Sequence, residues 1–273
     1  MQIEALNGVG AEVTAIDLRR MTDGEEVDLK QAFADHGVLF FRDQSLRPED
    51  HIAFARRFGP ININRFFKAT ETHPEIAEVR KEKDQTTNIG GAWHTDHSYD
   101  QEPALGSVLV ARDLPQTGGD TLFASMYAAY DGLSDGLKET LSRLRAVHSS
   151  RHVFGAQGAY RDEKGERIGN AQAATQDAIH PVVITHPLSG RKALYVNPAF
   201  TLYFEGWTQE ESWPLLSYLY KHATNEAYTT RFVWQPGSVA FWDNRATWHY
   251  ALNDYHGDFR LMHRITIEGC PLV

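Results

Sequence analysis

Short β-rich runs separated by turn residues constrain the fold of this chain more than any other feature. Six of them follow residue 100, each bounded by Gly, Pro, Asn or Asp: 107–111, 179–185, 192–197, 229–234, 238–242 and 260–267. Few helical patterns separate these runs, so a parallel α/β sheet is a poor fit. We expect a mainly β fold with flanking helices, arranged as a double-sheet jelly roll.

The first sixty residues are expected to alternate strand, helix, strand and helix. Residues 25–36 and 48–58 have helical patterns, and the apolar run 38–41 between them is a strand candidate. A third helix is predicted after Thr208 and Glu211, which have the spacing of a capping box.

One domain is expected over residues 1–273, because no repeat, low-complexity tract or Pro/Ser-rich linker divides the chain. Residues 155–174 are polar, rich in Gly, Gln and Ala, and without a period. Loops of this length without structure of their own are usually functional or disordered, so we expect a mobile loop or lid there.

The net charge limits the kinds of partner we expect, and the cysteine content indicates the redox compartment. The chain has 27 Lys plus Arg against 36 Asp plus Glu, a net charge of −9, and no basic stretch, which argues against nucleic acid as the main partner. A single cysteine, Cys270, excludes a disulfide framework and fits a reducing compartment. With no signal peptide and no apolar run long enough to span a bilayer, we expect a cytoplasmic protein without membrane association.

The chain has 13 histidines, and a histidine two residues before an acid can share one strand face with it and grip a metal. Three pairs have this form: His73/Glu75, His94/Asp96 and His256/Asp258. Composition alone predicts about two, so the motif by itself decides nothing. Sequence context favours His94 and Asp96, which lie among aromatic residues, whereas the other two pairs lie in polar segments typical of solvated surface.

His249 is the best candidate for a third ligand. If its surroundings form a strand, it faces away from Trp248 and Tyr250. Two histidines and one carboxylate form the facial triad of non-haem Fe(II) oxygenases, which leaves three metal positions open. Zinc accepts the same ligands with a water, so hydrolysis stays open on ligand type alone.

Arg260 and Arg264 would point to one face of a strand, roughly 13 Å apart at the usual rise per residue. An apolar set lies on the opposite face: Leu261, His263, Ile265 and Ile267. The arginines therefore either face water or face a pocket. In a pocket each needs an anion, and a planar guanidinium suits a carboxylate or a sulfonate.

Five ordered motifs together resemble a known family. They are His94-Thr95-Asp96, Gly118-Gly119-Asp120-Thr121-Leu122, Trp242-Asp243-Asn244-Arg245, His249 and Arg260-x-Met262-His263-Arg264. In this order they resemble the taurine dioxygenase family of Fe(II)- and 2-oxoglutarate-dependent dioxygenases. The resemblance runs nearly end to end, from residues 41–44 to the C-terminal strand.

The resemblance implies a distorted double-stranded β-helix, jelly-roll and cupin-like, with helices packed outside it. It implies His94, Asp96 and His249 as the ligands of Fe(II), with Trp242 as an aromatic residue close to the metal.

It also implies that Thr121 and Arg260 hold the distal carboxylate of 2-oxoglutarate. The implied reaction converts this cosubstrate to succinate and CO2 with O2 and hydroxylates a C–H bond of a small organic anion.

Other family positions imply a substrate pocket. Arg264 matches the arginine that binds the sulfonate in taurine enzymes, which implies an anionic head group. Phe154 and Phe200 match aromatic pocket positions. His97, next to the ligand pair, either lines the pocket as well or is a hydrogen-bonded neighbour of it, and we favour the pocket.

The positions that would hold the taurine amine are altered. Asn64 stands where a histidine is expected, Phe67 where a tyrosine is expected, and Gly90 where an asparagine is expected. A buried ammonium without partners is costly, so we expect a larger, more apolar anion than taurine. Candidates are an alkyl or aryl sulfonate, a sulfate ester and an aryloxyalkanoate.

Three alternatives stay open. The first is taurine dioxygenase proper, which releases sulfite and aminoacetaldehyde. The second is a zinc hydrolase with the same ligands, which gives Thr121 and Arg260 no role. The third is a non-catalytic jelly-roll binding protein. Relatives form dimers or tetramers, so the resemblance also allows a homo-oligomer.

Overall fold

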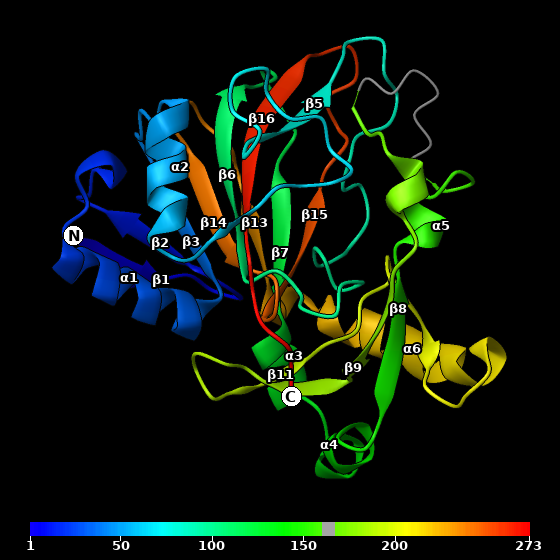
Figure 1. The fold of residues 1–273 in the computed structure, drawn as a ribbon. Helices are drawn as coiled ribbons and strands as arrows, with labels where there is room; N and C mark the ends of the chain where they lie inside the picture. Colours follow the sequence, from blue (N-terminus) through cyan, green and yellow to red (C-terminus); the bar gives the residue numbers. More distant parts are fainter. Residues whose placement is uncertain (160–166) are drawn as a thin grey trace.

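The computed structural model describes residues 1–159 and 167–273, and it is built around two facing β-sheets (Figure 1). The main sheet has the strand order β1 (Gln2–Ala5), β2 (Ala11–Thr14), β3 (Val38–Phe41), β14 (Val239–Asp243), β6 (Gly106–Asp113), β16 (Arg260–Ile267) and β4 (Ile61–Asn62), and β5 (Ala77–Lys81) also pairs with β16. The second sheet has the order β13 (Thr229–Phe232), β7 (Thr121–Ser125) and β15 (Thr247–Ala251). The mainly β jelly roll expected from the sequence is confirmed.

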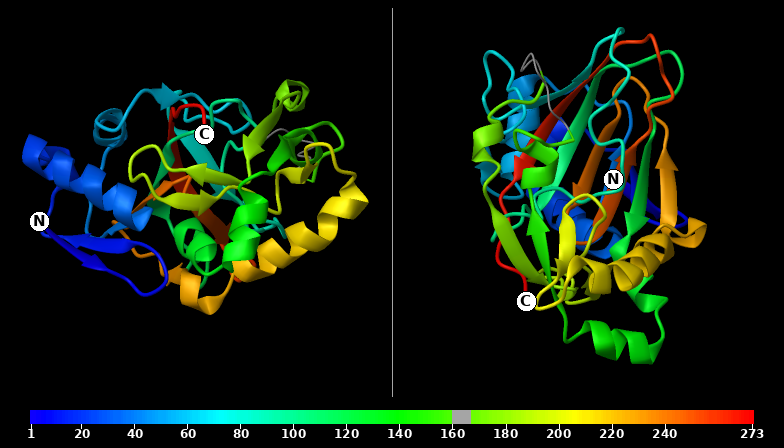
Figure 2. Two further views of the ribbon diagram at one scale, coloured as in Figure 1. Left: turned by 90° about the horizontal axis from the view of Figure 1, so that it is seen from below. Right: turned by 90° about the vertical axis from the view of Figure 1, so that its right-hand side faces the viewer.

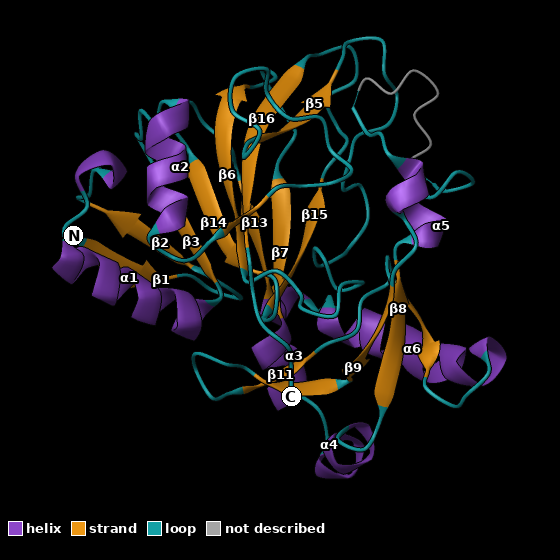
Figure 3. Ribbon diagram, viewed as in Figure 1, coloured by secondary structure: helices purple, strands orange, loops and turns teal. Residues whose placement is uncertain are grey.

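Smaller elements surround the two sheets (Figure 3). Two further sheets are formed by β12 (Thr201–Phe204), β8 (Arg145–Ser149) and β9 (Asp177–Pro181), and by β10 (Val183–Thr185) and β11 (Lys192–Leu194). The helices are α1 (Asp23–His36), α2 (Pro48–Arg56), α3 (Met126–Asp131), α4 (Asp135–Leu141), α5 (Arg151–Phe154), α6 (Gln209–Ala223) and the short 3-10 helices Leu18–Arg20, Ala171–Ala173 and Glu226–Tyr228. Figure 2 shows α1 and the N-terminal hairpin at one side of the molecule and α6 at the other.

Side chains on the main sheet alternate between two apolar cores. Phe241 of β14 faces outward, where its ring stacks on Phe33 of α1 with centroids 4.1 Å apart and also meets Phe54 of α2. Phe40 of β3 faces inward and stacks on Phe232 of β13, with centroids 4.3 Å apart. This period of two is the geometry of a pleated strand, and here it separates a helix-covered face from a face that looks into the sandwich.

The same alternation decides where the two arginines of β16 point. Ile265 and Ile267 belong to the outer core under the helices, whereas Met262 belongs to the inner core. Arg260 and Arg264 share the parity of Met262 and are only 4% and 5% exposed. The water-facing alternative is therefore wrong, and both guanidinium groups lie inside the sandwich.

Three helices predicted from the sequence are present. Thr22 caps α1 through a capping box with Glu25, which moves its start to Asp23, and Thr208 and Glu211 form the predicted capping box of α6. Helix α2 begins at Pro48 as predicted and ends at Arg56.

Two local expectations are wrong. Residues 179–185 form two strands in place of one: β9 ends at Pro181, and β10 begins at Val183 and pairs with β11. The chain also begins with a β1–β2 hairpin where a single strand was expected. The expected lid, 155–174, falls partly on 160–166, which lie outside the described residues, so a lid stays a prediction.

No helix within residues 1–159 and 167–273 combines the length and the hydropathy that a bilayer-spanning segment needs.

The turn between β14 and β15 is built on a buried ion pair. Asp243 accepts hydrogen bonds from Arg245 at 2.9 and 2.6 Å and from His186 at 2.9 Å. Thr247, the first residue of β15, donates its hydroxyl to the Asp243 carbonyl at 2.7 Å. Asp243, held by Arg245 and His186, thus fixes through Thr247 where β15 begins, and with it the position of His249.

Replacing Asp243 with asparagine should lower the free energy of unfolding by about 3–5 kcal/mol, because it leaves the Arg245 charge buried without a counter-charge. Urea denaturation followed by tryptophan fluorescence measures this. Asp131→Asn is the control, since it breaks an exposed ion pair with Arg191 and should cost less than about 1 kcal/mol. Equal losses in the two variants would contradict the assigned role.

Candidate metal centre and anion sites

A short backbone bridge brings His94 and His249 together although 155 positions separate them. The His94 N–H donates to the His249 carbonyl at 3.1 Å, and the His249 N–H donates to the His94 carbonyl at 2.8 Å. The two rings lie with their centroids 4.0 Å apart. Because β15 holds His249 in the second sheet, this bridge fixes the loop that carries His94 against that sheet.

Asp96 completes a three-residue cluster. Its carboxylate oxygens lie 3.8 Å from His94 Nε2 and 4.0 Å from His249 Nε2. The ligand atoms of all three residues lie within 4.8 Å of one another, and within the described residues no other group has this spacing. The pairs at His73 and His256 accordingly contribute to no such cluster.

The protonation of the cluster suits a metal ligand set. His94 Nδ1 donates to the Ala92 carbonyl at 2.7 Å, which leaves the Nε2 lone pair facing Asp96. Burial lowers the pKa of both His94 and His249, so both rings are neutral, the form that binds metals. Burial alone would raise the pKa of Asp96, but the Arg264 guanidinium, foremost among the neighbouring charges, holds it below its ordinary value.

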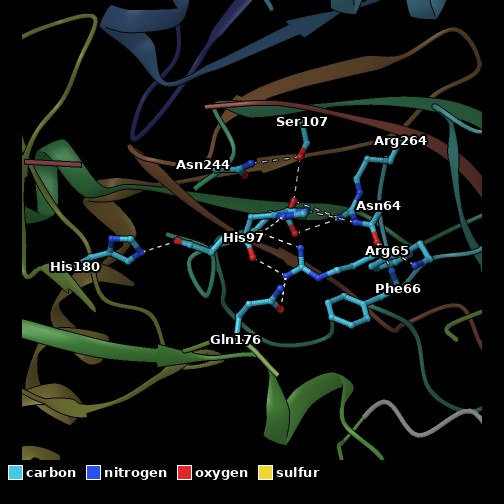
Figure 4. A network of polar contacts seen from close by, with 12 residues as sticks. Asn64, Arg65, Phe66, His97, Ser107, Gln176, His180, Asn244 and Arg264 are labelled. Carbon is cyan, nitrogen blue, oxygen red and sulfur yellow. Dashed lines mark hydrogen bonds and ion pairs between the residues drawn. The ribbon is translucent and has the colours of Figure 1, made fainter. Parts of the chain in front are cut away.

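Two side chains orient the Asp96 carboxylate (Figure 4). Arg264 Nη1 donates to both of its oxygens at 3.2 and 3.3 Å, and the Ser107 hydroxyl donates at 3.1 Å. Asn244 in turn contacts Ser107 and accepts a hydrogen bond from Trp242 Nε1 at 2.8 Å. Trp242, the aromatic residue expected near the metal, is therefore linked to the Asp96 carboxylate through Asn244 and Ser107.

Arg260 is a second buried cation, and it has no carboxylate partner among the described residues. Its Nε and Nη2 atoms are buried and have no hydrogen-bond acceptor. Nearby, Thr121 accepts a hydrogen bond from Trp234 Nε1 at 3.0 Å, so its own hydroxyl proton is free for another acceptor. Gly119 lies so close that a Cβ there would be 3.3 Å from Arg260 Nε. A buried guanidinium with unpartnered donors beside a hydroxyl that can donate has the chemistry to receive an anion.

One cavity joins these groups. Ten of the twelve predicted site residues line it: Phe67, His94, Asp96, Thr121, Phe154, Phe200, Trp242, His249, Arg260 and Arg264. Gly90 lines it as well. The sequence analysis missed other wall residues, among them Val79, Ile89, Tyr99 and Val153. Val79 lies on β5, so the alternation of side chains along a strand could have predicted that it points inward. Loop residues such as Ile89 and Tyr99 carry no comparable signal.

Asn64 and His97 are not among the residues that line the cavity, and both belong to a polar network (Figure 4). Asn64 Oδ1 accepts the backbone N–H groups of Phe66 and Phe67 at 2.9 and 3.0 Å, and its amide lies 3.4 Å from His97 Nε2. His97 Nδ1 donates to Asp100 at 2.9 Å. Contact of either residue with a ligand stays a prediction.

Arg65 joins this network to a third segment. It donates to Asp100 at 2.5 and 3.3 Å and to Gln176 at 3.1 Å, and its guanidinium lies 4.9 Å from the Phe66 ring centroid. His180 donates to the Asp100 carbonyl at 2.9 Å. The network therefore fixes the loop that carries Phe66 and Phe67 relative to the loop that carries Asp96.

Comparison with known proteins gives a consistent result. Residues 2–266 match the family described as taurine catabolism dioxygenase TauD, TfdA family. An alkylsulfatase of Acinetobacter baylyi is 35% identical over 98% of this chain and 85% of its own. The (S)-phenoxypropionate/alpha-ketoglutarate-dioxygenase of Sphingobium herbicidovorans is 33% identical over 96% of this chain and 92% of its own. The crystal structure of a taurine dioxygenase from Burkholderia xenovorans superposes with a TM-score of 0.83 at 33% identity, covering 100% of this chain and 90% of that one. The chain belongs to the TauD/TfdA dioxygenase family.

Proposed function

We propose that this protein is an Fe(II)- and 2-oxoglutarate-dependent dioxygenase that hydroxylates a small organic anion with an apolar body and releases succinate and CO2. The observation that carries the proposal is the presence, in one buried cavity, of the His94/Asp96/His249 cluster and of an arginine, Arg260, whose charge has no partner among the described residues.

The donor set fits Fe(II). Two neutral imidazoles and one carboxylate, with the remaining positions open, form the ligand set of non-haem Fe(II) oxygenases. His94, Asp96 and His249 would hold the metal, and Ser107 and Arg264 would orient the carboxylate ligand from behind.

Arg260 and Thr121 fit the distal carboxylate of 2-oxoglutarate. A buried guanidinium with two unpartnered nitrogen donors favours an anion, and the Thr121 hydroxyl can donate beside it. When bound, the metal and 2-oxoglutarate together supply the oxidative decarboxylation that drives transfer of oxygen from O2 to a substrate C–H bond.

The chain itself positions the reactants and excludes water. Phe67, Tyr99, Phe154 and Phe200 belong to one apolar cluster and form an aromatic wall of the cavity, where the substrate body would pack. Arg264 lies at this wall with its guanidinium 4.3 Å from the Phe67 ring centroid, and it would take the anionic head group.

The cavity disfavours taurine. Asp96 is the single acid among the described lining residues, and it is already held by Arg264. Asn64, at a position expected to hold the amine, uses its carbonyl oxygen for the backbone of the neighbouring loop. An ammonium group would therefore be buried without an acceptor, which favours an alkyl or aryl sulfonate, a sulfate ester or an aryloxyalkanoate.

The other two alternatives explain fewer observations. A zinc hydrolase or a binding protein with a structural triad gives no reason for a buried Arg260 without a carboxylate partner among the described residues. Family membership likewise supports the dioxygenase.

His94→Ala should abolish tight binding of a divalent metal, because it removes one of three protein ligands. Calorimetric titration with Mn(II) measures the affinity. His256→Ala is the matched control, since His256 stands in the same His-x-Asp spacing but on the exposed surface and should leave the affinity unchanged. Equal affinities of the two variants would refute the ligand assignment.

Arg260→Ala should raise the KM for 2-oxoglutarate by on the order of 10- to 100-fold, because hydrogen bonds to a charged group contribute about 1.5–3 kcal/mol. The KM for the organic anion should change little, since Arg264 would bind that anion. Succinate formation measured at varied concentrations of each reactant separates the two. A selective rise in the KM of the organic anion would reverse the assignment of the two arginines.

Taurine and 1-propanesulfonate differ by an ammonium in place of a methyl group and form a matched pair. We expect kcat/KM for 1-propanesulfonate to exceed that for taurine by about 100-fold or more, because no acceptor is placed for the ammonium. Succinate formation coupled to each sulfonate measures the ratio. Equal efficiencies would favour taurine dioxygenase proper.

A further inference from the structure

Lys81 is a buried lysine that lies beside another buried cation, Arg260. It ends β5, is 2% exposed, and stands directly opposite Arg260 across the β5–β16 ladder. Lysines are almost never fully buried unless they are paired, and like charges opposite each other destabilise a sheet. Within residues 1–159 and 167–273, Lys81 nevertheless forms no ion pair. Such a placement needs a compensating contact.

The compensating contact is Tyr255. Lys81 Nζ donates to the Tyr255 carbonyl at 3.3 Å and lies 4.4 Å from the centroid of its ring. Tyr255 is 3% exposed and belongs to the loop between β15 and β16. A backbone hydrogen bond and a cation–π contact from the same ammonium group therefore fix both the main chain and the ring of this residue.

Tyr255 also contacts the cation on the other strand. Its hydroxyl lies close enough to the Arg260 guanidinium for the two groups to interact electrostatically, and the Arg260 Cζ atom lies 6.0 Å from the ring centroid. The Trp234 ring lies 5.9 Å from the same Cζ. These contacts hold Arg260 in place while its Nε and Nη2 atoms keep no partner. The chain of contacts runs from Lys81 through Tyr255 to Arg260.

We propose that Lys81 and Tyr255 are positioning residues for the distal carboxylate of 2-oxoglutarate: Lys81 fixes Tyr255, and Tyr255 fixes the Arg260 guanidinium in the orientation that receives the carboxylate. The proposal rests on the cosubstrate assignment made above. It explains why a lysine is buried opposite an arginine, because a bound carboxylate offsets part of the local positive charge.

The test compares binding of two oxo acids by isothermal titration calorimetry to protein loaded with Mn(II). 2-Oxoglutarate has the distal carboxylate, and 2-oxopentanoate has a methyl group in its place. The variants are Lys81→Met, Lys81→Arg and Tyr255→Phe. Lys138→Met is the matched control, because Lys138 also donates to a carbonyl, at 2.9 Å, and also lies over a tyrosine ring, at 5.5 Å, but away from the cavity.

Lys81→Met and Tyr255→Phe should each raise the Kd of 2-oxoglutarate by about 3- to 10-fold, the effect of losing one polar contact, and leave the Kd of 2-oxopentanoate unchanged. Lys81→Arg should restore most of the affinity, and Lys138→Met should have no effect.

An unchanged Kd for 2-oxoglutarate in both Lys81→Met and Tyr255→Phe would overturn the proposal, as would an equal rise for both oxo acids, which indicates general damage to the site. Because Tyr255→Phe keeps the ring, it tests the proposal even where Lys81→Met fails to fold. Absence of 2-oxoglutarate binding by the unaltered protein would instead refute the cosubstrate assignment itself.

Discussion

The structure depends on the burial of two guanidinium groups inside a sheet sandwich. Arg260 and Arg264 point inward because Ile265 and Ile267 of the same strand must face the core under α1 and α2. A buried charge is costly unless it is paired and hydrogen-bonded. Arg264 is paired, through Asp96, whereas Arg260 has no carboxylate among the described residues. Among the described residues, the fold therefore places one cation that is paired with a carboxylate and one that is not in a single cavity, and this asymmetry is the basis of the proposed function.

The metal cluster follows from a few backbone contacts. Three elements supply its ligands and their support: the loop of His94 and Asp96, β15 with His249, and the turn at Asp243 that sets where β15 begins. The bridge between the two histidines uses main-chain groups, so it constrains the ring separation independently of any metal. Such preorganisation limits the side-chain entropy that metal binding would otherwise remove.

Much of this could be predicted from the sequence, and the limits have physical causes. Helix starts were predictable where a capping box or a proline marks them, as at Thr208 and Pro48. A period of two on β16 predicts which residues share a face, but both faces of this strand are covered, so the pattern does not tell which face looks into the cavity. The face that looks into the cavity becomes known only from the positions of the helices that cover Ile265.

Two residues show where sequence-based prediction stops. Asn64 is polar and sits at a family position for substrate binding, yet its oxygen caps its own loop, a local hydrogen bond that competes with any ligand. Lys81 carries no motif at all, and its role depends on Tyr255, 174 positions away, a partner that only the folded chain brings to it.

The environment of Arg264 also limits how an anion can approach it. The Phe67 ring covers one face of the guanidinium at 4.3 Å, and Asp96 occupies Nη1. Nε is buried without a partner, so the group has hydrogen-bonding capacity left along one edge only. A planar or tetrahedral anion would therefore bind in the plane of the guanidinium, beside the metal ligand. Its body would then extend along the aromatic wall, which couples the head-group contact to the apolar character expected of the substrate.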